Sequence, residues 1–314
     1  MLSSTICSYP DRGKWGNNKY RGNCSGKLIK DIVETPCYHI LDKNGKPIQG
    51  LSDYMVGGGT TEDVCKEEGV PGTYLDLNRG FDMMTMEIPE RPDNIFWHPP
   101  YGQMIVYSDK MYKAEDIIAK YGFDPRVNDL SRAKDWQDFV DKMNYCLLKQ
   151  FTALKKGGRM FVLMGDWKQK GRLYSMLCDI VKLGTLEQIV IKAEHNCWSD
   201  NNTYSSMNFV PIQHEYLMVL RKDSAMLIPA SVAKNSVFSI LEAKTSTWKD
   251  ILQAVLEEAG RPLSRRDLYA AVKESARAKT GDNNNIEAKI RQTLGRFPRV
   301  FRAISEDHYS LVAA

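Results

Sequence analysis

Asp93-Asn94-Ile95-Phe96-Trp97-His98-Pro99-Pro100-Tyr101-Gly102 is the stretch that decides the fold. Residues 94–97 are mostly apolar and are soon followed by two prolines, which predicts a short buried strand and then a rigid turn. A proline has no N–H for a sheet ladder, so the strand cannot continue. In an open α/β sheet, ligands bind at the carboxyl ends of the strands. We therefore expect His98, the prolyl carbonyls and the ring of Tyr101 at a ligand crevice.

The bulk composition is that of an ordinary globular protein. The chain has 314 residues and a net charge of +4, with 43% hydrophobic and 26% charged residues, enough for one large domain and a smaller one. No apolar run approaches the roughly 18 residues of a membrane span. The N-terminus lacks a signal-peptide layout, so we expect a cytoplasmic protein without membrane contact.

Cysteine and histidine spacing gives no metal motif. The seven cysteines are scattered, and no pair has the Cys-x-x-Cys spacing of a structural zinc site. The triplet His195-Asn196-Cys197 could suggest a metal site or a nucleophile. Without a partner motif it indicates a surface loop instead, and we expect no metal.

A glycine cluster before the Pro-Pro turn predicts a nucleotide crevice. A strand at 53–56 ends in Gly57-Gly58-Gly59-Thr60-Thr61, and a helix is expected at 62–68. Strand, glycine turn and helix form the nucleotide-binding unit of doubly wound folds. A Walker lysine and a complete GxGxxG are missing, and a plain tight turn is the alternative. The next expected strand, at 72–77, contains Asp76, which is placed to bind ribose hydroxyls.

The middle of the chain continues the alternation of helices and strands. Helices are expected at 27–34, 113–121, 136–154 and 173–183, and strands at 160–164, 187–192 and 214–222. The region 104–135 follows the Pro-Pro turn and suits contact with the flanks of a substrate, with a solvated insertion as the alternative. Residues 223–246 show no strong pattern and are interpreted as a linker with at most one short helix.

From residue 247 the pattern changes to three short helices and a hairpin. Helices are expected at 248–259, 264–278 and 286–294, and strands at 300–304 and 309–312. This order predicts a winged helix-turn-helix domain over 247–314. A basic cluster near its end indicates DNA binding, with a solvated face of a protein-interaction module as the alternative; it consists of Arg291, Arg296, Arg299 and Arg302.

These motifs together resemble the amino-methyltransferases of DNA, whose motif is Asp/Asn/Ser-Pro-Pro-Tyr/Phe/Trp. Residue 98 departs from that motif because it is His. The glycine loop precedes the Pro-Pro-Tyr motif, as in the gamma arrangement of these enzymes. The resemblance implies a doubly wound, Rossmann-like class I methyltransferase domain over 1–222. Its sheet would have seven strands, one of them antiparallel. The segment 247–314 resembles a HARE-type winged helix.

The resemblance also implies a cofactor, a partner and two sets of site residues. The cofactor is S-adenosyl-L-methionine and the partner is DNA, in a restriction-modification setting and with a homodimer as one assembly. The catalytic set is His98, Pro99, Pro100 and Tyr101. The cofactor-binding set is Asn23, Ser25, Asp53, Gly57, Gly59, Thr60, Thr61, Asp76 and Asp82.

The implied reaction is direct methyl transfer to the amine of a flipped base, most simply adenine N6. Tyr101 would stack on the base, while the Pro99 carbonyl and His98 accept hydrogen bonds from the amine. Neutral imidazole has one acceptor nitrogen, so His98 fits only if its other nitrogen carries the proton. Methylation of cytosine N4, methylation of a protein glutamine, and a weakly catalytic DNA-binding protein of the same fold are the alternatives.

Overall fold

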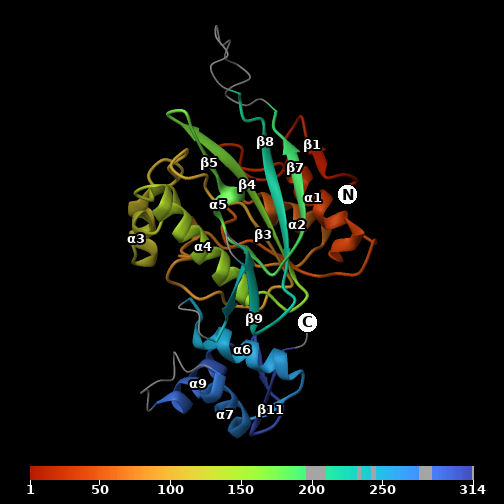
Figure 1. The fold of residues 1–314 in the computed structure, drawn as a ribbon, viewed down its shortest axis with the longest axis vertical. Helices are drawn as coiled ribbons and strands as arrows, with labels where there is room; N and C mark the ends of the chain where they lie inside the picture. The colour runs from red at the N-terminus through yellow and green to blue at the C-terminus, as the bar shows by residue number, and fades with distance from the viewer. Residues whose placement is uncertain (196–209, 232–234, 242–244, 276–284, 313–314) are drawn as a thin grey trace.

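The computed structural model describes residues 1–195, 210–231, 235–241, 245–275 and 285–312. A seven-stranded sheet lies between helices, and a smaller helical module lies at one end of it (Figure 1). Six strands of the sheet lie side by side in the order β1-β7-β8-β4-β3-β2. The seventh, β5, pairs only with β4. The strands are β1 (Ile6–Ser8), β2 (Leu51–Ser52), β3 (Asn94–Trp97), β4 (Arg159–Gln169), β5 (Arg172–Ser175), β7 (Thr185–Ala193) and β8 (His214–Arg221).

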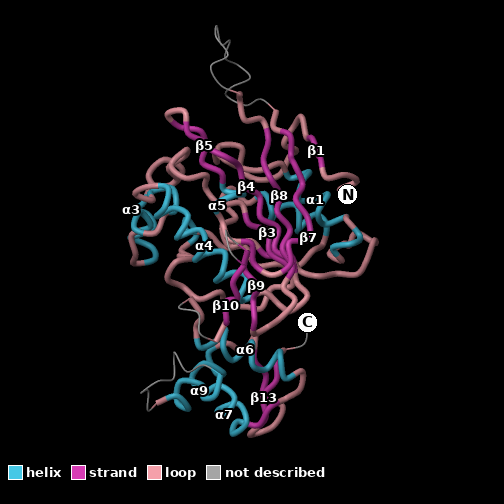
Figure 2. The backbone as a smooth tube through the Cα atoms, viewed as in Figure 1, coloured by secondary structure: helices cyan, strands magenta, loops and turns pink. Residues whose placement is uncertain are grey.

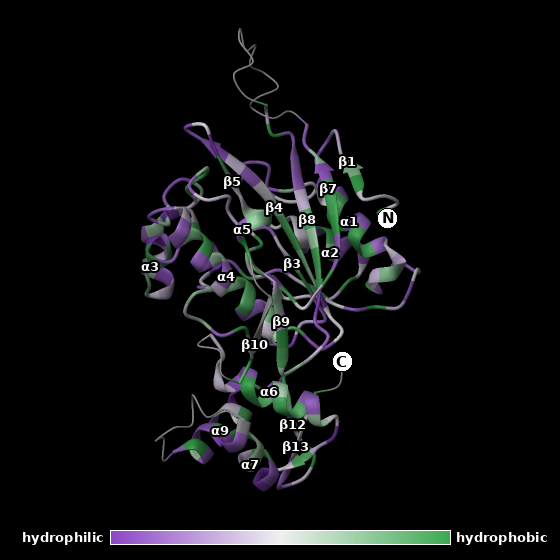
Figure 3. Ribbon diagram, viewed as in Figure 1, coloured by the Kyte–Doolittle hydropathy of each residue, from purple (hydrophilic) through white to green (hydrophobic). Residues whose placement is uncertain are grey.

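The central strands β3 and β4 are buried on both faces. Ile95 and Trp97 belong to the same core as Phe139 of α4 (Trp136–Ala153). Phe96 belongs to the opposite core, together with Leu28 of α1 (Gly26–Glu34) and with α2 (Thr60–Glu68). Successive strand residues point to opposite faces, so a continuous apolar run is what two covering layers require. Figure 3 shows the central part of β4 as hydrophobic. The predicted α/β class is confirmed.

The six strands from β1 to β2 have the predicted directions, with one antiparallel strand among them. β2, β3 and β4 are mutually parallel, and β1 is parallel to β7. β8 is antiparallel to both of its neighbours, β4 and β7. Figure 2 shows these strands side by side at the centre of the larger part of the chain. β5 adds a second antiparallel strand at the far end of β4, which the sequence prediction did not include.

The chain reverses its direction across the sheet at β2. After β2, Asp53 forms an isolated parallel bridge with Tyr74 on one side, and the chain then returns to β3 on the other side. Ligands bind at such a switch point, beyond the carboxyl ends of the strands. The strands expected at 53–56 and 72–77 are wrong: β2 ends at Ser52, and the two ranges contribute only the isolated bridge between Asp53 and Tyr74. The Asp53 carboxylate accepts the N–H of Met55 at 3.0 Å, a local bond that turns the chain out of the ladder.

The helix expected at 173–183 is wrong. The structure has β5, the single-turn α5 (Met176–Asp179) and β6 (Lys182–Leu183) in its place. Lys170 and Gly171 both have positive φ, 49° and 78°, between the paired residues Gln169 and Arg172. A two-residue turn with two positive φ values closes a hairpin. The Lys-Gly pair was therefore the feature of the sequence that could have predicted the hairpin.

The C-terminal module contains the predicted elements in its described residues. They are α6 (Trp248–Ala259), α7 (Arg265–Ser275), α9 (Ile286–Arg296) and a three-stranded antiparallel sheet of β11 (Leu263–Ser264), β13 (His308–Leu311) and β12 (Phe301–Ala303). The module has a hydrophobic core of its own, which includes Leu252, Leu268 and Ile290. None of the described helices is long and apolar enough to cross a bilayer.

The segment expected as a linker is built into the fold. Residues 223–246 contain β9 (Leu227–Ser231) and β10 (Asn235–Ser239), which pair with each other, and β9 also pairs with β6. The described part of this segment has no helix. The described parts of this segment therefore belong to the fold and are not a free linker.

One face of α6 is bound to the sheet domain by polar contacts. Lys249, which is 1% exposed, donates to the carbonyl of Ile88 at 3.1 Å. Gln253 donates to the carbonyl of Ala153 at 3.0 Å, and Glu257 accepts the N–H of Lys156 at 2.6 Å. Side chains four positions apart share a helix face. Because these carbonyls and amides precede β3 and β4, the module sits at the amino ends of those strands.

We predict that Lys249→Ala destabilises the protein by about 1.5–3 kcal/mol, because it removes a charged donor from buried carbonyls. The measurement is the urea unfolding midpoint. Lys273→Ala is the matched control, since Lys273 is exposed on the neighbouring helix α7, and its effect should stay within about 0.5 kcal/mol. Equal midpoints for the two variants would show that the Lys249 contacts do not fix the module.

Candidate active site

Two cavities open beyond the carboxyl ends of β2 and β3, and His98 lines both of them. The first cavity lies beside the glycine loop and includes Asp53, Gly57 and Asp76. The second lies beside the Pro-Pro turn and includes Pro99, Tyr101 and Glu215. His98 directly follows β3, so the end of that strand places one side chain at the junction of two binding spaces.

The glycine loop is covered closely by the N-terminal segment. The N–H of Asn17 donates to the carbonyl of Gly58 at 2.8 Å. A Cβ atom on Gly58 would lie 2.6 Å from the side chain of Asn23. Gly57 and Gly59 have φ of 51° and 88°, a region that L side chains rarely adopt. The loop therefore needs its glycines both for its turn and for the approach of the covering segment.

Asp76 is a buried carboxylate at the first cavity. It is 6% exposed, and its two oxygens accept the N–H groups of Gly57 at 2.8 Å and Asn78 at 2.9 Å. Burial raises its pKa, while these hydrogen bonds act in the opposite direction. Each carboxylate oxygen has more than one acceptor site, so Asp76 can hold the glycine loop and still accept hydroxyl groups from a ligand.

Asp53 is a second buried carboxylate at the same cavity, at the end of β2. It is 2% exposed and accepts from the Thr61 hydroxyl at 2.6 Å. Burial raises its pKa to about 7, although the Thr61 and Met55 hydrogen bonds oppose the shift. No described Lys or Arg forms an ion pair with Asp53 or with Asp76. The first cavity is therefore suited to a ligand with hydroxyl groups and positive charge.

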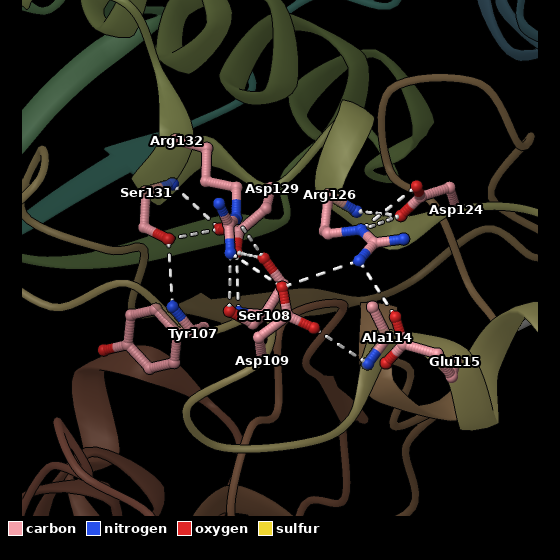
Figure 4. Close-up of polar contacts among 10 residues, drawn as sticks. All are labelled: Tyr107, Ser108, Asp109, Ala114, Glu115, Asp124, Arg126, Asp129, Ser131 and Arg132. Atoms are coloured by element: carbon pink, nitrogen blue, oxygen red, sulfur yellow. Dashed lines mark hydrogen bonds and ion pairs between the residues drawn. The ribbon is translucent and has the colours of Figure 1, made fainter.

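The region after the Pro-Pro turn is ordered by a network around Asp129 (Figure 4). Asp129 accepts the N–H of Ser108 at 2.8 Å and the hydroxyl of Ser131 at 2.5 Å. Arg132 donates to the Ser108 hydroxyl at 2.6 Å and to Asp109 at 3.0 Å. A buried carboxylate with this many donors fixes two distant turns against each other.

Three tyrosines that the sequence analysis missed line the first cavity, and this network orders the region that supplies two of them. Tyr107 and Tyr112 come from the fixed region, and the ring of Tyr20 lies 5.7 Å from that of Tyr107. The region had been expected beside the substrate. Its residues Met104 and Ile105 do line the second cavity and Tyr107 lines both, while Tyr112 and residues 128–130 line the first. The tyrosine-rich composition was visible in the sequence, but the cavity that it serves was not.

The second cavity is built around Tyr101, whose ring lies on the backbone of β4. A Cβ atom on Gly165 would be 2.6 Å from the ring, so only glycine permits this contact. The Tyr101 hydroxyl donates to Glu215 of β8 at 2.5 Å and lies 2.9 Å from Nε2 of His98. Glu215 is a site residue that the sequence analysis missed, although the strand that carries it was expected at 214–222.

A lysine stabilises the ionised form of Glu215 in this buried position. Lys192 of β7 donates to Glu215 at 2.8 Å and also pairs with Glu194. Burial acts to raise the pKa of Glu215, but Lys192 and His98 outweigh it and lower that pKa. Burial and the charge of Glu215 raise the pKa of Glu194. Burial lowers the pKa of His98, so its imidazole is neutral near pH 7.

The structure brings most of the predicted site residues to these two cavities. Asn23 lines both, Pro99 lines the second, and the first receives Pro100, Thr60, Thr61 and Asp82. Asn128 donates to Asp82 at 2.6 Å. Ser25 and Gly59 do not line either cavity. Ser25 precedes α1, and Gly59 is the residue before α2.

The predicted DNA-binding arginines lie elsewhere. Arg291 and Arg296 are on α9, Arg299 follows it, and Arg302 is on β12; all four are exposed. Their module is at the amino ends of the strands, opposite to both cavities (Figure 1). Each residue of β4 advances the chain by about 3.3 Å, so its 11 residues separate the two ends by roughly 30 Å or more.

The described residues cover only part of the triplet His195-Asn196-Cys197, which was weighed as a metal site. The described residues contain no group of three or more His, Cys, Asp or Glu side chains that could hold a metal ion. Nε2 of His195 lies 2.7 Å from the Ser8 hydroxyl. Asn196 and Cys197 of the noted triplet, and the loop up to residue 209, lie outside the described residues.

Comparison with known proteins gives only distant structural likenesses. No protein-family model matches the chain. No curated protein matches it either. A Thermus thermophilus protein assigned as a DNA modification methylase, solved also with S-adenosyl-L-methionine, has a TM-score of 0.25 and 14% identity. The match covers 56% of this chain and about half, 53–54%, of that one.

A second solved structure is a Haemonchus contortus phosphoethanolamine N-methyltransferase, with a TM-score of 0.28 and 8% identity. The match covers 73% of this chain and 43% of the chain of that enzyme. These structure neighbours are methyltransferases. Because the overlaps are partial and the scores low, we base the assignment of function on the contacts within this chain.

Asp53→Asn should make stability less dependent on pH. Folding raises the pKa of Asp53 from 3.8 to about 7, so the folded state binds the proton more tightly between those values. Its contribution to stability is present at low pH and is lost as pH rises toward 7. We expect the variant to gain about 1–4 kcal/mol over wild type at pH 8 and to lose this gain near pH 4.

Urea unfolding of the ligand-free protein at both pH values measures this difference. Asp116→Asn is the control, because Asp116 is an exposed aspartate on α3 (Ala114–Tyr121). A gain of equal size at both pH values would mean that ionisation of Asp53 is not its source.

Proposed function

We propose that the chain is an S-adenosylmethionine-dependent methyltransferase that methylates the exocyclic amine of a base in DNA. The observation that carries the proposal is the position of His98, which lines both a carboxylate-rich nucleotide cavity and the cavity of the Pro-Pro-Tyr turn. A methyl donor in the first cavity and an amine in the second would meet there. We propose adenine N6 as the acceptor, and cytosine N4 is the alternative outcome.

The residues of the first cavity fit this cofactor. S-adenosylmethionine would supply a positively charged sulfonium whose methyl group is transferred. Asp76 keeps acceptor capacity for the ribose hydroxyls, and the positive φ of Gly57 lets the backbone approach the ligand closely. The unpaired carboxylates Asp53 and Asp76 favour a cation over an anionic nucleotide. Tyr20 and Tyr107 would provide apolar walls for the nucleoside.

The residues of the second cavity would orient the amine. The carbonyl of Pro99 and the side chain of His98 would accept its two hydrogens and turn its lone pair toward the methyl group. The Tyr101 ring, held on Gly165, would support the flipped base. Positive charge develops on the amine nitrogen during transfer, so fixed acceptors stabilise that state more than the ground state.

The hairpin of β4 and β5 supports a polyanionic substrate. It carries Lys168, Lys170 and Arg172, all exposed, and Lys168 also lines the second cavity. Figure 3 shows this hairpin as hydrophilic beyond the end of the hydrophobic sheet. Cations beside the base cavity can contact the phosphates that flank a flipped nucleotide.

The direct test is transfer of a labelled methyl group from S-adenosylmethionine to DNA, followed by nucleoside analysis of the product. N6-methyl-2′-deoxyadenosine in the digest supports the proposal, and N4-methyl-2′-deoxycytidine selects the alternative base. Label transfer to protein would favour a glutamine methyltransferase. Binding of cofactor and DNA without label transfer would favour a protein that keeps the fold for DNA binding alone.

Asp76→Ala should weaken S-adenosylmethionine binding by about ten- to a hundredfold, since a hydrogen bond to a charged group contributes about 1.5–3 kcal/mol. Isothermal titration calorimetry on the folded variant measures the change, with exposed Asp116→Ala as the control. Unchanged affinity would remove Asp76 from the cofactor site.

His98→Ala should lower the single-turnover rate by about a hundredfold or more, by analogy with the loss of one transition-state acceptor. His98→Asn keeps an acceptor and should remain active. Burial lowers the pKa of His98 from 6.5, so wild-type activity should fall only below pH 6.5, as the imidazole protonates. The Asn variant should lack this acid limb. An Ala variant close to wild type would exclude a catalytic role for His98.

Two matched charge reversals locate the DNA surface. Lys170→Glu with Arg172→Glu changes the hairpin, and Arg299→Glu with Arg302→Glu changes the distant module. A duplex of about 12 base pairs centred on the target reaches only about 20 Å to each side. We expect the hairpin variant to lose tenfold or more affinity for such a duplex and the arginine variant to lose little.

On a duplex of about 40 base pairs both variants should lose affinity, because DNA of that length can reach both ends of the protein. Fluorescence anisotropy at two salt concentrations provides the comparison. If the arginine variant weakened the short duplex as much as the hairpin variant, the base would enter from another direction.

A further inference from the structure

Four side chains, of which His98 is the first, form a continuous series of contacts. Nε2 of His98 lies 2.9 Å from the Tyr101 hydroxyl, which donates to Glu215 at 2.5 Å, and Glu215 accepts from Lys192 at 2.8 Å. They come from the Pro-Pro turn, β8 and β7. The Pro-Pro-Tyr reaction proposed above uses only the first two, so the role of Glu215 and Lys192 is open.

The direction of these hydrogen bonds follows from proton counting. Lys192 has only donors, and Glu215 beside it is an ionised carboxylate with only acceptors. A tyrosine has one hydroxyl proton, and the carboxylate takes it. The Tyr101 oxygen can then only accept from His98, so Nε2 must carry the proton. In neutral imidazole the remaining nitrogen, Nδ1, is then the acceptor.

We propose that Glu215 acts through Tyr101 as a positioning residue that holds His98 in the Nε2–H tautomer and so leaves Nδ1 to accept the substrate amine. This inference rests on the proposed function for the identity of the amine. It explains how a histidine can stand at a position where the resembling enzymes use a fixed oxygen acceptor. The other tautomer would present an N–H to the amine, which is also a donor.

The surroundings of His98 agree with this assignment. The ionisable groups that face it are Tyr101, Glu215 and Lys192, with Glu194 beyond Lys192. Glu215 lies 3.8 Å from Nε2 of His98, so Tyr101 stands between them as the direct partner. Among the described residues, Nδ1 of His98 has no hydrogen-bond partner. The Tyr101 ring cannot shift toward β4, because Gly165 is already in close contact with it.

The first test is spectroscopic and does not depend on activity. Long-range proton–nitrogen correlation spectra of protein with 15N-labelled histidine distinguish protonated from unprotonated ring nitrogens. The chain has five histidines, and His98→Asn identifies the signals of His98 by their loss. We expect a protonated Nε2 and an unprotonated Nδ1 in wild type near pH 7.5. A protonated Nδ1, or a mixture of tautomers, would overturn the proposal.

Glu215→Leu removes the acceptor and should let the Tyr101 proton turn to His98, so the Nδ1–H form should appear. A second His–Tyr pair on β8 provides the control, since Nε2 of His214 lies 2.7 Å from the Tyr216 hydroxyl. Tyr216→Phe should leave the His98 signals unchanged. A Glu215→Leu protein that keeps the Nε2–H form alone would show that another group sets the tautomer.

The second test is a double-mutant cycle in single-turnover methyl transfer. Glu215→Leu should slow the His98 enzyme by about tenfold or more, but should hardly slow the His98→Asn enzyme, because an amide oxygen accepts without a tautomer to select. Equal slowing in both backgrounds would assign Glu215 a merely structural role. If no methyl transfer occurs at all, the proposed function fails, while the wild-type spectrum still decides the tautomer.

Discussion

The site depends on the early end of β3. Pro99 and Pro100 cannot extend the ladder, so β3 pairs with β4 only over Asn94–Trp97 opposite Arg159–Val162. β4 itself continues to Gln169 and remains paired with β8 as far as Gly165. The length of β4 beyond Val162, which no longer pairs with β3, forms a step in the sheet, and residues of the second cavity lie at that step.

Several other features follow from this step. The chain that leaves Pro100 turns onto the part of β4 that β3 does not cover, where the ring of Tyr101 packs against Gly165. The same extension places Glu215 at the level of the Tyr101 hydroxyl and carries the basic β4–β5 hairpin past the cavity. A longer β3 would fill the step with its own side chains. Two prolines therefore determine both the cavity and the residues that line it.

Local signals in the sequence predicted a large part of this arrangement. Three elements are determined by residues close to them in the sequence, and the structure has all three. They are the strand before Pro99, the turn at the glycines 57–59, and α6 with its row of apolar residues. Glu215 and Lys192 could not be predicted, because their roles come from the alignment of β7, β8 and β4 across the sheet. The helix expected at 173–183 was wrong because the preceding turn at Lys170-Gly171 reverses the chain into a hairpin.

The buried carboxylates of the two cavities differ in how their charge is balanced, and this difference has a functional meaning. Glu215 has Lys192 as a resident partner, so its charge is constant and can hold neighbouring side chains in place. Asp53 and Asp76 accept hydrogen bonds but form no ion pair with a described cation, and the charge of Arg79 acts on them only from a longer distance. A buried carboxylate without a counter-charge destabilises the empty protein. A cationic nucleoside that enters the first cavity would relieve this penalty, so part of its affinity would come from charge that the fold leaves unbalanced.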